Sequence, residues 1–187
     1  MDQPTDPTDV TLLDRFVQGD MRAYEILLQR YQKPVYNFVR RLVASPEETE
    51  DLTQEVFIRL FEKAAELQRG SSFRAWLWSI AANLCRDHFK SQRYRHHASL
   101  ETPGVPQPIS PPTQERALEE AEIGAQVEAA IRALKEEYRI ALVLKEYQRL
   151  SYQDIAAAMN CPLGTVKSRL FAARKELQKR LAPLMRG

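Results

Sequence analysis

The chain has 187 residues, of which 44% are hydrophobic and 28% are charged, with a formal net charge of +2. This composition is typical of a soluble globular protein and excludes an intrinsically disordered chain. Its longest uncharged apolar runs, such as residues 76–84, are too short to span a bilayer. Residues 1–11 are acidic and have no apolar core, so they are not a secretory signal and we expect a cytoplasmic protein.

The charge is distributed unevenly along the chain. Residues 47–66 hold seven acids and two bases, whereas residues 69–97 hold six bases and one acid. Residues 163–187 are also basic, with seven bases and one acid. Two separate basic segments suggest two contacts with a polyanion, and the acidic segment suggests a basic protein partner. Solvent-exposed helix faces would give the same pattern, so charge alone does not distinguish binding surfaces from ordinary solvated faces.

Apolar spacings of three and four recur along the chain while period-two alternation is absent, so we expect an all-α fold. A first helix is expected over residues 9–18, followed by a break at Gly19. Residues 23–43 predict a second helix, which Pro34 kinks or interrupts.

A third helix is expected to begin at Ser45 and Pro46, because proline suits the first helical position, and to run to Leu67. Its buried stripe should comprise Leu52, Val56, Phe57, Leu60, Phe61, Ala64 and Leu67.

Gly70 is expected to end the third helix, and Ser71 or Ser72 to cap a fourth. The core stripe of this fourth helix should comprise Phe73, Trp76, Leu77, Ile80 and Leu84. Trp78 falls outside the stripe, which predicts that it stacks on a ligand or packs on a partner protein.

A proline-rich stretch separates two helical parts of the chain. Five prolines fall within residues 103–112, with few apolar neighbours. Because such a stretch cannot pack a core, we expect a flexible linker over residues 93–117. Two small helical domains would then cover residues 1–92 and 118–187.

The second domain should contain four helices, over residues 118–134, 138–147, 151–159 and 163–181. Ser151 and Asp154 form a capping box for the third of these. A tight turn follows at residues 160–162, and Pro162 can occupy the first position of the last helix.

A short helix, a three-residue turn and a longer basic helix describe a helix-turn-helix motif, whose second helix enters the DNA major groove. The buried side of that helix should comprise Val166, Leu170, Ala173, Leu177 and Leu181. The residues expected to contact bases and phosphates are Thr165, Lys167, Ser168, Arg169, Phe171, Arg174 and Lys175. A helical hairpin with a basic solvent face is the alternative interpretation.

The segments at residues 150–156 and 164–170 closely resemble the domain of extracytoplasmic-function (ECF) sigma factors that reads the promoter −35 element. In the N-terminal half, residues 18–20 (QGD), 31–32 (YQ), 51–58 (DLTQEVFI) and 69–77 (RGSSFRAWL) resemble, in order, successive parts of sigma region 2. The resemblance covers almost the whole chain outside the linker and is strongest to the envelope-stress-like subgroup of the sigma-70 family. It implies an alternative sigma factor that binds core RNA polymerase and directs promoter-specific initiation.

The resemblance also implies the roles of two surfaces in the N-terminal domain. The third helix would grip the coiled coil of the largest polymerase subunit through Asp51, Gln54, Glu55 and Ile58. The fourth helix would bind the opened −10 element through a polar and basic face at spacings of 4, 3 and 4, comprising Ser79, Asn83, Arg86 and Lys90. Asn83 matches the asparagine with which the family captures an unstacked base.

Two positions depart from the family pattern. Gln68 stands where the family usually has an aromatic residue, which implies a base pocket built differently, and Ala172 stands where related proteins often carry arginine. The second departure implies a somewhat relaxed −35 preference.

Core RNA polymerase, through its largest-subunit coiled coil and its flap, and promoter DNA are the partners that the resemblance implies. It also implies an anti-sigma factor that keeps the protein inactive until a stress signal. We expect no cofactor, no metal and no catalytic residue. Cys85 and Cys161 fit no metal-binding spacing, and no further ligand is spaced to complete a site with His96 and His97.

Two other functions are compatible with these sequence features. A repressor or activator with the same helix-turn-helix would form a stable homodimer and bind duplex DNA tightly without polymerase. A nucleic-acid enzyme would use Glu50, Asp51 and Glu55 to hold a metal, but no second acidic cluster and no lysine base accompany them. We therefore expect a protein that is not an enzyme.

Overall fold

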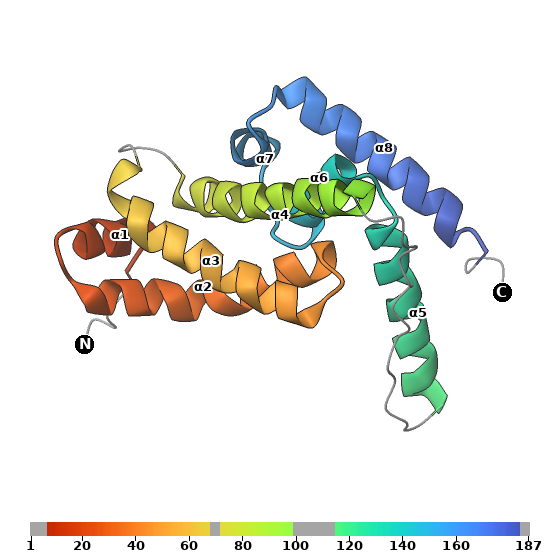
Figure 1. The fold of residues 1–187 in the computed structure, drawn as a ribbon, viewed down its shortest axis with the longest axis horizontal. Helices are drawn as coiled ribbons and strands as arrows, with labels where there is room; N and C mark the ends of the chain where they lie inside the picture. The colour runs from red at the N-terminus through yellow and green to blue at the C-terminus, as the bar shows by residue number, and fades with distance from the viewer. Residues whose placement is uncertain (1–6, 68–71, 99–114, 184–187) are drawn as a thin grey trace, which may run out of the picture.

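The computed structural model describes residues 7–67, 72–98 and 115–183 (Figure 1). This part of the chain contains eight α-helices, one short 3-10 helix and no β-strand, which confirms the expected all-α class. An N-terminal bundle comprises α1 (Asp9–Val17), α2 (Met21–Leu42), α3 (Pro46–Lys63), the 3-10 helix η1 (Ala64–Glu66) and α4 (Phe73–Ala98). A C-terminal bundle comprises α5 (Glu115–Arg132), α6 (Glu136–Glu146), α7 (Tyr152–Met159) and α8 (Leu163–Leu181).

The predicted linker lies mostly outside the described residues, which leave out residues 99–114. Regular helix enters both ends of the predicted segment, since α4 continues to Ala98 and α5 begins at Glu115. Within the described ranges, no helix combines the length and the apolar character that a bilayer span requires.

Several helices begin where side chains satisfy free backbone N–H groups, as the sequence predicts. Ser45 accepts a hydrogen bond from the backbone of Glu48 at 3.3 Å and Pro46 follows it, which confirms the start of α3. Ser72 accepts from the backbone of Ala75 at 3.2 Å, whereas the alternative cap Ser71 and the predicted terminator Gly70 lie outside the described residues. Pro34 lies inside α2, which continues past it to Leu42, so the chain is not interrupted there.

The core of the N-terminal bundle differs from the predicted stripes at three aromatic residues, and the predicted stripe residues Leu52, Leu67, Ile80 and Leu84 are half-buried. Trp78 is only 1% exposed and its ring lies 5.1 Å from that of Phe38, so the prediction that it leaves the core is wrong. Trp76, predicted to be buried, is half-buried instead. Phe61 is 46% exposed rather than buried. The predicted stripe was displaced around the helix, since the fully buried side of α4 runs through Leu77, Trp78, Ala81 and Cys85.

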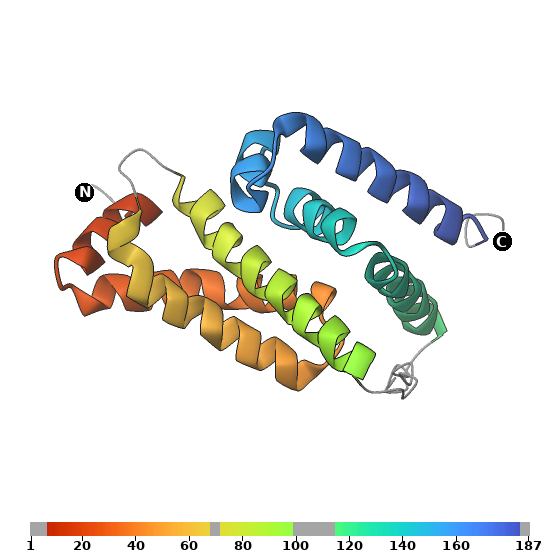
Figure 2. The ribbon, with the colours of Figure 1, turned by 45° about the horizontal axis from the view of Figure 1, so that its top comes forward.

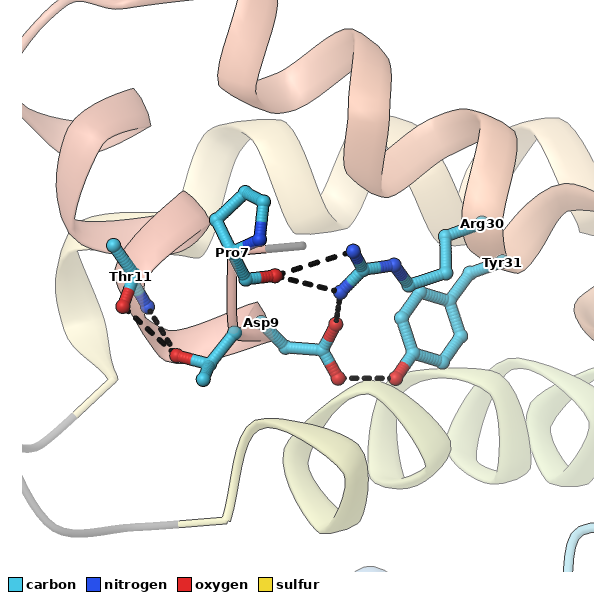
Figure 3. A network of polar contacts seen from close by, with 6 residues as sticks. Pro7, Asp9, Thr11, Arg30 and Tyr31 are labelled. Carbon is cyan, nitrogen blue, oxygen red and sulfur yellow. Dashed lines mark hydrogen bonds and ion pairs between the residues drawn. The ribbon is translucent and has the colours of Figure 1, made fainter. Parts of the chain in front are cut away.

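A polar network fixes α1 against α2 (Figure 3). The carboxylate of Asp9, at the start of α1, accepts hydrogen bonds from the Arg30 guanidinium and from the Tyr31 hydroxyl of α2. The guanidinium also donates to the carbonyl of Pro7 at 3.2 Å. Burial, and then the Asp9 carboxylate, raise the pKa of Tyr31 well above its usual range, so this hydroxyl stays protonated and donates.

The helix α4 lies in the middle of the molecule. It packs against α2 and α3 on one side and against α6 and α7 of the C-terminal bundle on another. Figure 2 shows this order, with α4 in yellow-green between the N-terminal helices and the blue C-terminal helices. The helix that carries the predicted −10 residues therefore also packs on the C-terminal bundle, as does α2, which contacts α5 and α6.

Candidate nucleic-acid and protein interfaces

The C-terminal bundle forms the predicted helix-turn-helix from α7 and α8. Ser151 caps α7 by accepting from the backbone of Asp154 at 3.0 Å, which confirms the serine cap of the predicted capping box. Asn160 then takes the left-handed conformation, with φ 47°, and ends α7. The helix α8 begins at Leu163 as predicted, but Pro162 occupies the cap position before it and not the first helical position.

One face of α8 is anchored in the core and the opposite face is open. Val166, Leu170 and Ala173 are buried, as predicted, whereas Leu177 and Leu181 are half-buried. The exposed members of the predicted −35 set are Lys167, Ser168, Phe171, Arg174 and Lys175, and Phe171 is 70% exposed. An exposed aromatic ring among cations is unusual on a free surface, and it suits contact with the methyl groups and edges of bases.

Three members of the −35 set, Thr165, Arg169 and Arg174, interact with neighbouring groups of the protein. Thr165 is half-buried, and its carbonyl accepts a hydrogen bond from Ser168 at 3.0 Å. Arg169 is half-buried, and its guanidinium lies 3.5 Å from the sulfur of Cys161 in the turn. Arg174 is exposed but pairs with Glu146 of α6 at 2.8 Å, and this hydrogen bond raises the pKa of Arg174. Arg174 would therefore exchange a protein carboxylate for a phosphate on binding DNA.

A hollow of about 430 Å³ adjoins the start of α8 and contains residues that the sequence analysis did not identify. Its lining brings together Lys167 of α8 with Lys145 of α6 and Tyr152 of α7. The Lys145 ammonium lies 4.9 Å from the centre of the Tyr152 ring. No spacing along the chain signals this cluster, because its members come from three different helices.

The predicted −10 residues lie along one side of α4 in two environments. Asn83 and Lys90 are exposed, whereas Ser79 and Arg86 are half-buried. The amide oxygen of Asn83 accepts a hydrogen bond from Arg86 at 3.0 Å, and Lys90 pairs with Asp87 at 3.4 Å. The face is therefore polar towards its N-terminal half and cationic towards its C-terminal half. Gln68, where the family pattern has an aromatic residue, lies outside the described residues.

The predicted protein-contact patch lies on α3, opposite its buried stripe. Asp51, Gln54 and Ile58 are exposed, and the Ile58 side chain keeps 49% of its surface accessible. Glu55 is half-buried and bonds to Arg59 at 2.7 Å.

Phe61 extends this patch by one turn of α3. Its ring lies 5.1 Å from Phe16 and 5.3 Å from Tyr24, which hold it against α1 and α2 while almost half of it stays exposed. Its spacing of three residues from Ile58 is the signal in the sequence, but spacing alone assigns Phe61 equally well to the buried stripe.

Two sequence families match the chain. The family described as Sigma-70 region 2 matches residues 27–95, and the family described as Sigma-70, region 4 matches residues 124–177. These matches cover the second to fourth helices of the N-terminal bundle and most of the C-terminal bundle.

Two characterised proteins are similar over nearly the whole chain. The RNA polymerase sigma-H factor of Pseudomonas aeruginosa is 36% identical over 191 residues, which cover 97% of this chain and 98% of that protein. The ECF RNA polymerase sigma-E factor of Escherichia coli K12 is 35% identical over 188 residues, which cover 96% and 97%.

Two solved structures share the fold. CnrH in complex with the cytosolic domain of CnrY gives a TM-score of 0.70 at 22% identity, over 94% of this chain and 97% of that one. The sigma factor RpoE in complex with the anti-sigma factor NepR, from Bartonella quintana, gives 0.65 at 24% identity, over 85% and 96%. Together with the family matches and the similarity along the whole sequence, this shows that the chain belongs to the ECF group of the sigma-70 family of RNA polymerase sigma factors.

Proposed function

We propose that this protein is an alternative sigma factor that binds core RNA polymerase and directs it to a specific class of promoters. The observation that carries the proposal is the similarity, at 36% and 35% identity, to two RNA polymerase sigma factors along almost their full length. In this proposal residues 1–92 act as region 2, residues 118–187 act as region 4, and residues 93–117 link them. The role requires no chemical step by the chain itself.

The α3 patch is the proposed contact with the polymerase coiled coil. An exposed isoleucine with Asp51 and Gln54 beside it offers an apolar centre with a polar, acidic rim, which is the usual anatomy of a protein interface. We include Phe61 in this contact, because its exposed ring continues the apolar surface from Ile58.

The two DNA surfaces have different substrates in this proposal. The α8 face reads duplex DNA at the −35 element, where its exposed cations reach phosphates and base edges. The α4 face receives the opened −10 strand, where the exposed amide of Asn83 reads a base and the cations of Arg86 and Lys90 hold the backbone.

A separate anti-sigma factor is the proposed regulator. The similar RpoE structure contains the anti-sigma factor NepR, and CnrH is likewise solved with a second protein, the cytosolic domain of CnrY. We propose that such a partner keeps this chain from polymerase in the cytoplasm until a stress signal releases it.

Reconstituted transcription tests the proposal. Purified protein and core RNA polymerase are combined on genomic DNA of the source organism, and the RNA 5′ ends are sequenced. We expect discrete start sites that are absent with core polymerase alone and that share two conserved upstream elements. If the protein adds no start sites to those of core polymerase, the proposal is wrong.

A further inference from the structure

Tyr94 lies near the C-terminal end of α4, beyond the residues assigned above to the −10 surface. Its side chain is 80% exposed, more than any other large apolar or aromatic side chain in the described ranges. Phe171, on the proposed −35 surface, is next at 70%. A single exposed tyrosine is common on protein surfaces, so the position of Tyr94 along α4 decides whether it has a role.

Helical spacing places Tyr94 on the same side of α4 as Asn83 and Lys90. The steps from Asn83 to Lys90 and from Lys90 to Tyr94 are seven and four residues, which together make about three turns of an α-helix. Tyr94 therefore continues the polar and basic face that begins at Ser79, and it lies about 16 Å beyond Asn83 along the helix axis.

The opposite side of this part of α4 is fixed to α3. The Gln92 side chain donates hydrogen bonds to both carboxylate oxygens of Glu48, at 3.1 and 3.3 Å. The Nε2 atom of His88 lies 3.5 Å from the same carboxylate. Gln92 is about half a turn around the helix from Tyr94, so these contacts hold the helix and leave the tyrosine ring open to solvent. Binding at Tyr94 would then order one side chain and not a whole helix end.

The exposed neighbours of Tyr94 on α4 suit a nucleic acid better than a protein. From position 83 to position 93, every fully exposed residue is polar or charged, namely Asn83, Asp87, Lys90, Ser91 and Arg93. The Lys90 ammonium pairs with Asp87 at 3.4 Å, and both side chains are largely exposed, so a phosphate can replace this carboxylate. An aromatic ring beside cations is the arrangement with which proteins stack unpaired bases and hold their phosphates. The α3 patch, in contrast, has two exposed apolar side chains.

We propose that Tyr94 is a further contact for the opened −10 region, where its ring stacks on an unpaired base other than the one read by Asn83. This inference rests on the proposed role of α4 in −10 recognition. Stacked bases of one strand are about 3.4 Å apart, so a distance of about 16 Å places the second base at most about five nucleotides from the first. Lys90, between the two residues, would hold the intervening backbone.

Abasic scanning of the −10 strand tests this contact in the full-length chain bound to core RNA polymerase. The probe is a fluorescein-labelled single strand that covers the −10 element of a promoter found by the reconstituted transcription, and both strands of that element are tested. Abasic sites are placed one at a time along the probe, and fluorescence anisotropy measures the affinity.

In wild type, two separate positions of the probe should each weaken binding about fivefold or more when the base is removed. Asn83→Ala should become insensitive to one of these positions, and Tyr94→Ala should become insensitive to the other. A variant loses its sensitivity only where the missing base and the missing side chain belong to the same contact.

Tyr94→Phe separates stacking from hydrogen bonding, because it keeps the ring and removes the hydroxyl. It should bind the strand like wild type and keep both sensitive positions. Tyr147→Ala is the matched control, since it removes an exposed tyrosine from the segment between α6 and α7. It should also bind the strand like wild type.

Wild-type affinity and two sensitive positions in Tyr94→Ala would overturn the inference and leave the −10 surface intact. Equal losses in Tyr94→Phe and Tyr94→Ala would overturn it too, since the hydroxyl and not the ring would then make the contact. Weaker binding of Tyr94→Ala to core polymerase, with strand binding unchanged, would show a protein contact instead. If wild type bound no −10 strand, the proposed role of α4 would fail and this inference with it.

Discussion

At the scale of single residues, Asn83 and Arg169 represent the two proposed DNA surfaces. Asn83 is exposed on α4, where its amide oxygen accepts from Arg86 and its amide nitrogen, which has no hydrogen-bond partner among the described residues, can reach a base edge. Arg169 lies half-buried at the start of α8, where the sulfur of Cys161 is a weak partner that a guanine edge or a phosphate would replace. The two side chains should therefore contribute to different steps of initiation.

Arg169→Ala should weaken binding of the polymerase complex to duplex promoter DNA by about 1–3 kcal/mol, if the contact is a pair with a base edge. Asn83→Ala should leave duplex docking largely intact and impair strand opening. Gel-shift binding to the duplex and permanganate reactivity at the −10 element measure the two steps, and each variant is the control for the other. A pre-melted promoter should partly restore strand separation by Asn83→Ala, but its binding to −10 single strands should stay weak. Wild-type affinity for those strands would contradict the role of Asn83.

Cys85 gives a prediction on pH. Its thiol is fully buried in α4, and burial raises its pKa from the ordinary value of 9.0 to about 12. Above the ordinary pKa the unfolded chain releases this proton and the folded chain retains it, so the free energy of unfolding falls as pH rises from about 9 to about 12. Urea unfolding of Cys85→Ala should lose less stability between about pH 8 and about pH 10 than wild type does. Cys161→Ala, which alters a half-buried thiol, is the control and should follow wild type. Equal pH slopes for Cys85→Ala and wild type would show that Cys85 is not responsible.

Individual residues were only partly predictable from the sequence. The exposed cations of α8 follow from helical spacing around Val166 and Leu170, which fix the buried side. Thr49 and Thr53 were missed, because buried threonines satisfy their hydroxyls on the carbonyls of Ser45 and Thr49 within α3, both at 2.7 Å, which no spacing rule reveals.

At the scale of elements, the α3 patch is the proposed link to polymerase. Ile58→Asp should lower affinity for core RNA polymerase at least tenfold, because it places a desolvated charge at the apolar centre of the contact. Helical content should stay the same, since the side chain is 49% exposed in the free protein. Surface plasmon resonance on immobilised core polymerase measures the affinity, and circular dichroism measures the helix content.

Val10→Asp on α1 is the matched control for this prediction. Val10 is 47% exposed, almost as much as Ile58, but it lies on another helix. This variant should bind core polymerase like wild type. Equal affinities for Ile58→Asp and wild type would show that another face of the N-terminal bundle binds polymerase.

Helix boundaries were well predicted where the sequence carries capping residues, as at Ser45 and Ser151. The width of the buried face of each helix was not well predicted from the sequence, as α4 illustrates. A helix that packs on one neighbour buries a narrow stripe, whereas α4 also packs on the C-terminal bundle and buries Phe89 beside Arg139 of α6. The spacing of apolar residues along one helix does not reveal which other helices pack on its second side.

At the scale of the whole molecule, two helical bodies and their order along the chain were predictable, and their docking was not. A flexible linker by itself implies two domains without a defined relative placement. The structure instead packs α7 on α4 and joins Arg74 to the carbonyl of Gln148, 74 residues later in the chain. Alanines such as Ala75 and Ala82 give no sign in the sequence that they face another domain.

Cooperation between the two DNA surfaces is the central claim at this scale. Each small bundle offers few contacts, and two weak sites bind strongly together only when their geometry lets both engage at once. Core polymerase should impose that geometry by separating the bundles to match the promoter elements. A repressor that binds duplex DNA by itself would not need polymerase to position its DNA-binding surfaces.

Footprinting on one promoter, found by the reconstituted transcription, tests this claim most directly. DNase I and permanganate reactivity are compared for the protein alone, core polymerase alone and the two together, all at the same salt concentration. We predict that only the combination protects the −35 element and opens the −10 element. Strong, specific protection by the protein alone as a homodimer, with nothing added by polymerase, would contradict the account.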